Sequence, residues 1–501
     1  MARRHHYASF LTDGGRTRGS VAGFEGDIGI GRLVLPLVIV AFLAVSIYWW
    51  GFRDADDDVG RVLTLEDATI PTLLLPAGVA VDDAGLLLAG VSIECETTPE
   101  QWPTFQGSGS REGCTDAPTI TTPKIMWSQE VGISGWLNSP IVANNTVYVG
   151  SAGVLQGVPD RLDGVYAIDL GTGERKAYFQ ATHDVNGVAF GNGIVVATGD
   201  EGRVWGLSAS DMELVWEEQL GVAVFGHPLV IDDMVVVGDA DGYVTAYEIR
   251  TGTRLWQKQV DGAVRGGAST DGEIIVVAGE NRDVVAFDLS GEIVWRREVR
   301  SQDTAGALAR IYAAPTIVGD LVVITLLRED LFAEPAIAAL DKATGDEVWR
   351  ARDAAGLKND WGNIRSSPAH VGDLLVYGEA YSDRLIALDA LSGDTVWDTV
   401  TGSYCYPHWP SPVVVSGQVV LPRHDGGLYA VSVVTGQVEW RIFLGDHGGP
   451  GTFPPEFGAE FCQWGPEDSY SILSSPAVAP NGVILVGTLE GWLYAIGDRS
   501  W

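Results

Sequence analysis

The chain has 501 residues, of which 46% are hydrophobic and 20% charged, and this composition argues against an intrinsically disordered protein. Its formal net charge of −34 at pH 7 repels phosphate backbones, which argues against nucleic-acid binding and fits a well-hydrated acidic surface. The 63 glycines and 17 tryptophans favour an all-β fold, because glycine permits tight turns and tryptophan supplies bulky packing units.

A hydrophobic segment lies near the N-terminus. Residues 33–50, LVLPLVIVAFLAVSIYWW, carry no charge, and a helix of this length just crosses the hydrocarbon core. Arginines precede the segment and a run of aspartates follows it, so we expect a cytoplasmic tail over 1–32, a transmembrane helix over 33–50 and an extracytoplasmic remainder. A cleaved signal peptide is the alternative, but the leader is long and no small-x-small cleavage site follows. Residues 51–101 are then a linker or stalk.

Four cysteines follow the hydrophobic segment. An even number outside the cytoplasm permits disulfides, in three possible pairings. Cys95 and Cys114 are close in the sequence, which favours a bridge between them. The sequence has no CxxC pair or Cys/His spacing that would indicate a metal site.

From about residue 120 the sequence repeats. The unit at 366–400 contains four short runs rich in β-branched residues, separated by GD, SD and SG turns, which predicts four antiparallel strands joined by tight hairpins. Its end carries the signature A-x-D-x-x-T-G-x-x-x-W, which recurs along the chain at a spacing typical of propeller blades. The tryptophans of this signature are Trp216, Trp256, Trp295, Trp349, Trp397 and Trp440. In the first repeat, residues 167–177, the tryptophan is replaced by Ala177.

The signature has a structural explanation. Its Thr/Ser-Gly pair makes a turn, the Asp hydrogen-bonds the turn backbone, and the Trp can lie flat across the neighbouring blade. Because these tryptophans recur once per repeat, we interpret them as packing residues rather than ligands.

The two ends of the repeat array complement one another. The terminal AIGDRSW (495–501) stops before a fourth strand, whereas KIMWSQEV (124–131) holds Trp127 with no preceding repeat. If the early segment completes the last blade, the ring closes and no open sheet edge remains. This predicts an all-β, eight-bladed propeller over residues 102–501; seven blades is the alternative if the degenerate unit at 206–216 is misread.

The repeated signature is similar to the tryptophan-docking motif of the pyrroloquinoline-quinone (PQQ)-like propeller family, and WPTFQGSGSREG (102–113) resembles that family's opening segment. The family includes quinoprotein alcohol dehydrogenases, the lipoprotein subunit of the bacterial outer-membrane assembly machine, and sensor domains, so the resemblance implies a fold and leaves the function open. In the catalytic branch it implies two adjacent cysteines over the cofactor, Ca²⁺ ligands and a catalytic Asp. The chain has no adjacent cysteines and no coherent ligand set. We therefore expect no catalytic residue, metal or cofactor, with PQQ plus Ca²⁺ as the alternative.

The loops that precede each blade, here called inter-blade loops, should gather at one mouth of the channel, which is the default binding place in propellers. The longest precede the last three blades, and they contain aromatic, Arg and His side chains that suit a protein or peptide, a sugar or a flat ring. The candidate binding residues are Asp360, Trp361, Arg365, Tyr404, His408, Trp409 and Trp464. Cys405 and Cys462 lie in neighbouring inter-blade loops, so a bridge between them would pin the long loop over the mouth. The alternative is that these loops pack on one another as a plug.

The leading hypothesis is a non-catalytic propeller, tethered to the cell membrane and facing outward, that binds a protein or peptide partner. A PQQ-dependent dehydrogenase with a diverged cofactor site is the alternative. A sensory ectodomain would need a separate signalling partner, because the cytoplasmic tail is too short to hold a signalling domain.

Overall fold

The computed structural model of this protein describes the greater part of the chain after residue 93. The described residues are 94–95, 101–134, 138–299, 309–328, 336–352, 366–378, 384–401, 410–423, 426–444 and 472–498. All of them belong to one compact unit, Ala80–Trp501. Among these residues there is no helix with the length and apolar character needed to cross a membrane. The predicted transmembrane helix 33–50, the tail before it and nearly all of the predicted stalk lie outside the described residues.

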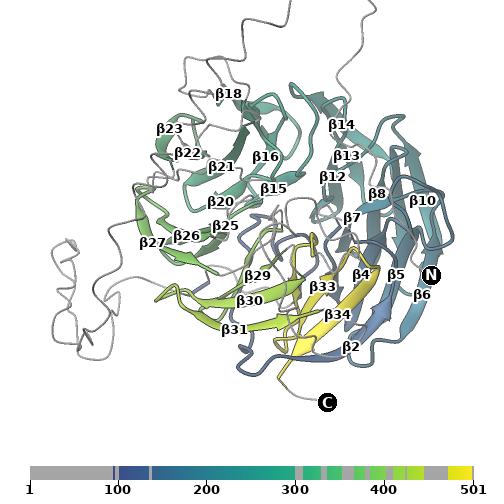
Figure 1. Cartoon of the computed structure of the whole chain (residues 1–501). Helices are drawn as coiled ribbons and strands as arrows, with labels where there is room; N and C mark the ends of the chain where they lie inside the picture. The colour runs from purple at the N-terminus through teal and green to yellow at the C-terminus, as the bar shows by residue number, and fades with distance from the viewer. Residues whose placement is uncertain are drawn as a thin grey trace, which may run out of the picture. The chain divides into compact units, whose positions relative to one another are not determined.

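The described residues form eight antiparallel sheets, each a meander of four strands, and the sheets follow one another around a ring (Figure 1). This confirms the eight-bladed propeller. The first four blades take their strands in chain order from the inside outward. These are blade 1, β3 (Ile141–Ala143), β4 (Thr146–Ser151), β5 (Gly164–Asp169) and β6 (Arg175–Gln180); blade 2, β7 (Val185–Gly191), β8 (Ile194–Gly199), β9 (Arg203–Ser208) and β10 (Leu214–Gln219); blade 3, β11 (Leu229–Ile231), β12 (Met234–Gly238), β13 (Tyr243–Glu248) and β14 (Arg254–Gln259); and blade 4, β15 (Ala268–Thr270), β16 (Ile274–Ala278), β17 (Asp283–Asp288) and β18 (Ile293–Glu298).

Blades 5 to 7 repeat the same order, and blade 8 combines strands from both ends of the array. These are blade 5, β20 (Thr316–Val318), β21 (Leu321–Arg328), β22 (Ala336–Asp341) and β23 (Glu347–Arg352); blade 6, β24 (Ala369–Val371), β25 (Leu374–Gly378), β26 (Arg384–Asp389) and β27 (Thr395–Val400); blade 7, β28 (Val413–Val415), β29 (Gln418–Pro422), β30 (Gly427–Ser432) and β31 (Val438–Phe443); and blade 8, β32 (Ala477–Val478), β33 (Ile484–Gly487), β34 (Trp492–Gly497) and β2 (Lys124–Glu130). Two short strands add to inner positions: β1 (Cys114–Thr115) beside β28, and β19 (Ala309–Arg310) beside β21.

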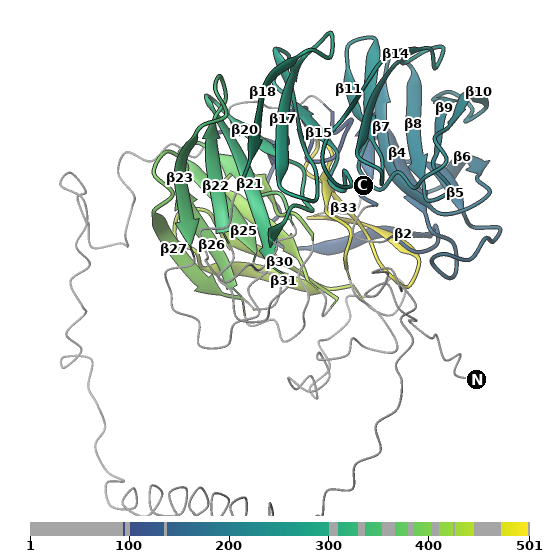
Figure 2. The same cartoon turned by 90° about the horizontal axis from the view of Figure 1, so that it is seen from above.

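The ring closes through β2, the early strand that pairs antiparallel with the C-terminal β34 and places Trp127 opposite Ala495 (Figures 1 and 2). Asp498, just after β34, accepts the backbone N–H groups of Thr121 and Thr122 at 2.8 and 2.7 Å. In blade 6, Asp389, which lies one position earlier in the repeat than Asp498, accepts two N–H groups of its own turn in the same way. At the closure, the segment before β2 and the residue after β34 therefore form hydrogen bonds like those that other blades form within one turn.

Seven tryptophans of the outer strands join neighbouring blades. Each indole Nε1 donates a hydrogen bond of 2.7–3.2 Å to a backbone carbonyl in the next blade or, for the last, in the segment before β2. The donor–acceptor pairs are Trp127–Leu170, Trp216–Ile249, Trp256–Leu289, Trp295–Lys342, Trp349–Ala390, Trp397–Val433 and Trp440–Ile120. The indole ring of the tryptophan also covers the turn glycine of the next blade. A Cβ on Gly393, whose φ is +75°, would meet the Trp349 ring at 2.5 Å. Glycine is therefore required there by both the backbone conformation and the close approach.

The segment before β2 runs along the inner strands of successive blades. Its backbone carbonyls accept the N–H groups that inner strands leave unpaired, near the ends of these strands that are far from the inter-blade loops. These bonds join Phe190 to Pro103, Thr270 to Gly109, Ile317 to Ser110, His370 to Glu112, and Val414 to Gly113. The disulfide between Cys95 and Cys114 fixes this segment, which confirms the pairing that the sequence favoured.

A buried stack lies between this segment and blade 3. The rings of Phe105 and His227 are parallel with centroids 4.1 Å apart, and the Arg111 guanidinium lies 5.7 Å from the Phe105 centroid. Arg111 donates hydrogen bonds to four uncharged oxygens, including Phe105 O at 2.8 Å and Ala268 O at 3.1 Å. Burial lowers the pKa of Arg111 to about 9, and burial with the nearby charge of Arg111 lowers the pKa of His227 to about 3. His227 is therefore neutral in the folded protein.

Candidate functional site

All seven candidate binding residues of the last three inter-blade loops, and with them Cys405 and Cys462, lie outside the described residues. The binding role of these residues stays a prediction. The described part of the same mouth is formed by the loops that lead into blades 2 to 5, and it holds two polar groups that sequence analysis did not single out.

The first group is centred on Arg265 in the loop before β15. Its guanidinium lies between two aromatic rings, 4.9 Å from the Phe225 centroid and 5.1 Å from the Tyr312 centroid. Arg265 Nε also donates to the buried Glu280 at 2.8 Å, and the Tyr312 hydroxyl donates to Glu280 at 3.2 Å. Arg310 binds the same carboxylate. We call these five residues the Arg265 cluster.

Charge and burial oppose each other at Glu280. Burial raises its pKa, but hydrogen bonds and charges of Arg265 and Arg310 outweigh it, so the pKa of Glu280 is below its usual value. Glu280 is therefore ionised and holds Arg265 in place. Because Phe225, Arg265 and Tyr312 are only partly buried, they present aromatic and cationic surface in a fixed geometry. Arg and aromatic side chains of this kind dominate protein–protein contacts.

A cavity of about 590 Å³ adjoins the cluster on blade 4. Its walls carry charges of both signs, which pair with one another: Arg296 binds Asp283 through two nitrogens, and Arg282 lies 3.3 Å from Glu298. The lining residues are Asp261, Asn281, Arg282, Asp283, Arg296, Glu298 and Arg310. Because these lining side chains pair with one another, the cavity is a polar recess. The pairing does not single out one lining acid or base for catalysis.

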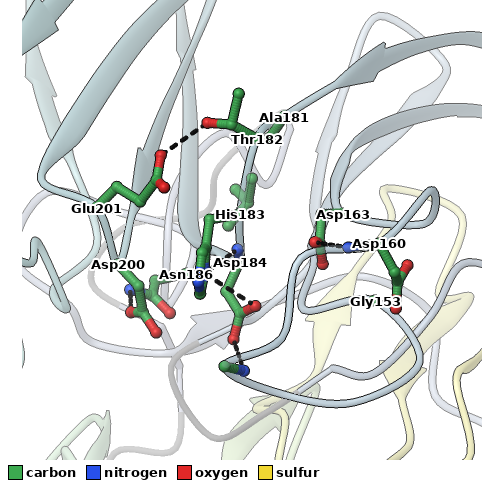
Figure 3. Close-up of polar contacts among 12 residues, drawn as sticks. Gly153, Asp160, Asp163, Ala181, Thr182, His183, Asp184, Asn186, Asp200 and Glu201 are labelled. Atoms are coloured by element: carbon green, nitrogen blue, oxygen red, sulfur yellow. Dashed lines mark hydrogen bonds and ion pairs between the residues drawn. The ribbon is translucent and has the colours of Figure 1, made fainter.

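The second group lies where blade 1 meets blade 2 (Figure 3). His183 and Asp184 precede β7, Asp200 follows β8, and their potential ligand atoms all lie within 4.8 Å of one another. Asp184 is fully buried; its Oδ2 accepts the Gly157 N–H at 2.7 Å, and its Oδ1 has no hydrogen bond. We call His183, Asp184 and Asp200 the junction cluster.

Carboxyl groups of this region resist ionisation. Burial raises the pKa of Asp184 to about 7, and the nearby negative charge of Asp200 adds to the effect. Burial also raises the pKa of Asp200 and of Asp163, a fully buried residue on the adjoining loop before β5. In the junction cluster, burial and the proximity of the two carboxyl groups therefore disfavour ionisation of both at once.

Sequence reasoning missed both groups. The Arg265 cluster draws on four separate loops and strands, with no short motif. The junction cluster had one local signal, the His-Asp pair directly before an inner strand, but its third member lies sixteen residues later in the chain, after β8.

Comparison with known proteins places the chain in a family. The profile described as "Outer membrane protein assembly factor BamB" matches residues 165–336 and 329–451, which together span more than half of the chain. The chain belongs to this family.

Curated BamB proteins match over most of their own length. The BamB of Moranella endobia is 25% identical over 337 residues, covering 63% of this chain and 81% of the relative. The BamB of Salmonella typhimurium is 24% identical over 392 residues, covering 75% and 89%. A lanthanide-dependent methanol dehydrogenase of Methylacidiphilum fumariolicum is 28% identical over 195 residues, but this covers only 33% of the chain and 31% of the enzyme.

Solved structures show the same fold as this BamB-family propeller. BamB from Moraxella catarrhalis superposes with a TM-score of 0.56 at 15% identity, covering 75% of this chain and 100% of that structure. A europium-containing methanol dehydrogenase superposes with a TM-score of 0.57 at 17% identity, covering 79% and 98%. At these identities the likeness concerns the fold alone.

The quinoprotein branch of such propellers implies PQQ, held under a disulfide of adjacent cysteines. In this BamB-family chain the described cysteines, Cys95 and Cys114, are bonded to each other across 19 residues of sequence. That disulfide lies on the segment that runs along the inner strands, away from the inter-blade loops. The two described cysteines therefore do not form such a clamp, and the absence of a cofactor stays a prediction.

Proposed function

We propose that this protein is a non-catalytic scaffold, tethered to the membrane and facing outward, that binds protein partners during the assembly of membrane proteins. The observation that carries the proposal is the family match over residues 165–451, together with curated relatives that are named outer membrane protein assembly factor BamB. The apolar segment 33–50 and the charges around it support the tether and the outward orientation.

The mouth formed by the inter-blade loops is the proposed contact surface. In its described part, the Arg265 cluster offers Phe225, Arg265 and Tyr312 as partly exposed anchors with fixed side chains, so a partner loses little conformational entropy in ordering them. The predicted residues of the last three loops, among them Trp361 and Trp464, would extend this surface. Acidic side chains of a partner would suit the Arg265 guanidinium, and apolar side chains would suit the flanking rings of Phe225 and Tyr312.

Photocrosslinking in the cells that make the protein tests this surface. A photoreactive amino acid at Phe225 or Tyr312 should give adducts with membrane-protein assembly components or their clients, identified by mass spectrometry. The same amino acid at Leu391, which is 71% exposed on a turn of blade 6 at the far end of the strands, should not. Equal adducts at Leu391, or none at either mouth position, would remove the mouth as the binding surface.

A matched pair of variants tests the central residue. Arg265→Ala should weaken capture of the crosslinked partner by about tenfold, the scale of one interface hot spot. Arg254→Ala, on the exposed outer strand of blade 3, makes the same change in charge and should leave capture unchanged.

The non-catalytic part of the proposal has its own test. The purified chain should show no saturable binding when titrated with PQQ plus Ca²⁺ and followed by calorimetry and quinone absorbance. Binding at micromolar or lower concentration would instead support a PQQ-dependent dehydrogenase and overturn this part.

A further inference from the structure

The junction cluster contains a buried carboxylate oxygen that lacks a hydrogen-bond donor. Asp184 is fully buried, and its Oδ1 faces His183 Nδ1 at 3.4 Å. His183 Nδ1, however, accepts the Asp184 backbone N–H at 3.0 Å, so this nitrogen carries no proton of its own in that arrangement. Asp184 Oδ1 therefore receives no hydrogen bond from this nitrogen, and a buried polar atom without a partner costs roughly 1–3 kcal/mol. A cation bound to Asp184 Oδ1 would remove this cost.

The neighbouring residues increase the negative charge at this point rather than neutralise it. Asp200 contributes a second carboxylate, which Asn186 orients by donating its Nδ2 to Asp200 Oδ1 at 2.6 Å. The same Asn186 amide is anchored on Val224 O at 2.9 Å, and Asp184 is anchored by the Gly157 N–H. These donors bind Asp184 Oδ2 and Asp200 Oδ1. They leave Asp184 Oδ1, which lies beside the His183 ring, without a hydrogen bond (Figure 3).

We propose that His183, Asp184 and Asp200 bind a divalent transition-metal ion of the Zn²⁺ or Mn²⁺ class. One imidazole with two carboxylates is a donor set that suits these ions, whereas Ca²⁺ and Mg²⁺ prefer oxygen alone. Ligand atoms within 4.8 Å of one another can share an ion at bond lengths of about 2.0–2.2 Å after a small contraction. The hydrogen bonds from Asn186 and Gly157 fix the ligands from behind, as is usual around metal sites.

The position of the site in the ring gives the ion a structural role. The cluster combines the loop that joins blades 1 and 2 with the loop after β8 of blade 2, and this is the junction at which the outer strand carries Ala177 in place of a docking tryptophan. Asp184 also holds Gly157 of the blade 1 loop. An ion here would fix the connecting loop to blade 2 at the mouth, and Asp184 would carry that constraint to blade 1 through Gly157. The tryptophans join the other blades at the opposite end of the strands. This inference does not depend on the proposed partner-binding function.

Metal binding can be measured directly on the full-length chain, purified without a histidine tag in detergent and treated with a chelator. We expect one Mn²⁺ per chain, seen as loss of the free-ion electron paramagnetic resonance signal, and competition by Zn²⁺. Asp184→Asn and His183→Ala should each weaken binding by at least about tenfold. Circular dichroism establishes that the variants are folded, and His183, which is partly exposed, serves if the Asp184 variant does not fold.

Glu201→Gln is the matched control. Glu201 is exposed next to Asp200 and binds Thr182 Oγ1 at 2.8 Å, so its substitution removes the same charge from the same turn without touching the cluster. Binding should be unchanged in this variant, and Zn²⁺ should raise the unfolding temperature of the wild type and Glu201→Gln but not of Asp184→Asn.

Three results would overturn the site. The first is no Mn²⁺ or Zn²⁺ binding up to millimolar concentration. The second is equal weakening by Glu201→Gln, which would mean diffuse attraction to the acidic surface. The third is an infrared carbonyl band of a protonated carboxyl at neutral pH that disappears in Asp184→Asn and does not respond to Mn²⁺, which would mean that a proton alone occupies this position.

Discussion

The hydroxyl of Tyr148 donates a hydrogen bond of 3.0 Å to the backbone carbonyl of Ala209. Ala209 occupies, in blade 2, the position whose carbonyl accepts an indole N–H in blades 1 and 3 to 7. Tyr148 lies on β4, the second strand of blade 1, and not on the outer strand, where Ala177 replaces the tryptophan. One junction of the ring therefore keeps the acceptor and takes its donor from a different strand.

The same junction has a second substitution, and it leads to a prediction about stability. Met212 stands where other repeats have the turn glycine; its φ is +62° and its side chain is buried. Met212→Gly would relieve about 1 kcal/mol of left-handed strain but remove a buried side chain worth about 2–5 kcal/mol. We expect a net loss of roughly 2 kcal/mol in the free energy of unfolding, measured by urea denaturation.

Asp232→Gly separates these two effects. Asp232 also has a positive φ, +49°, but its side chain is exposed. Its substitution should leave stability unchanged or raise it by up to about 1 kcal/mol. Loss of stability in both variants would mean that backbone flexibility, and not burial, dominates at Met212.

Ring closure gives the second prediction. Asp498→Ala removes the acceptor of the Thr121 and Thr122 N–H groups and should lower the free energy of unfolding by roughly 1 kcal/mol. Asp394→Ala, on an exposed turn inside blade 6, changes the charge equally without touching closure. Hydrogen exchange should show faster exchange of β2 amides in the Asp498 variant alone. Unchanged exchange in β2 would mean that strand pairing with β34 closes the ring without help from Asp498.

The sequence predicted those features of the fold that repeat. Hydrophobic runs, turn residues and recurring tryptophans predicted four-stranded blades. The isolated Trp127 at the start of the array and the incomplete repeat at its end favoured eight blades, with seven as the alternative, and the pairing of β2 with β34 confirms eight. Features that occur once could not be read in this way. Tyr148 is an ordinary buried strand residue in the sequence, and only the structure shows that its hydroxyl reaches Ala209. Arg265 likewise meets Phe225 and Tyr312 only because three blades bring their loops to one mouth.

The buried stack at His227 gives a pH-dependent prediction. Burial and the charge of Arg111 lower the pKa of His227 to about 3, against an ordinary value of 6.5. Between these values the unfolded chain binds more protons than the folded one, so His227 makes the protein lose stability as pH falls below 6.5, by up to about 1.4 kcal/mol per pH unit.

His227→Phe should remove this contribution, because phenylalanine can stack on Phe105 and does not titrate. The free energy of unfolding of the wild type should therefore fall more steeply than that of the variant between pH 6.5 and 4.5 in urea titrations. Parallel curves for the two proteins would show that His227 is protonated without unfolding, and hence that its site admits charge.

The last prediction concerns the side of the membrane on which the propeller lies. Five arginines before the apolar segment 33–50 and the aspartates after it orient the chain with its N-terminus inside. In intact cells, a membrane-impermeant maleimide should therefore label Ser290→Cys, on an exposed turn of blade 4, and should label Ala2→Cys only after the cells are opened. Deleting residues 33–50 should release the protein from the membrane fraction. Labelling of Ala2→Cys in intact cells would reverse the orientation, and retention of the deletion variant on membranes would assign the tether to another part of the chain.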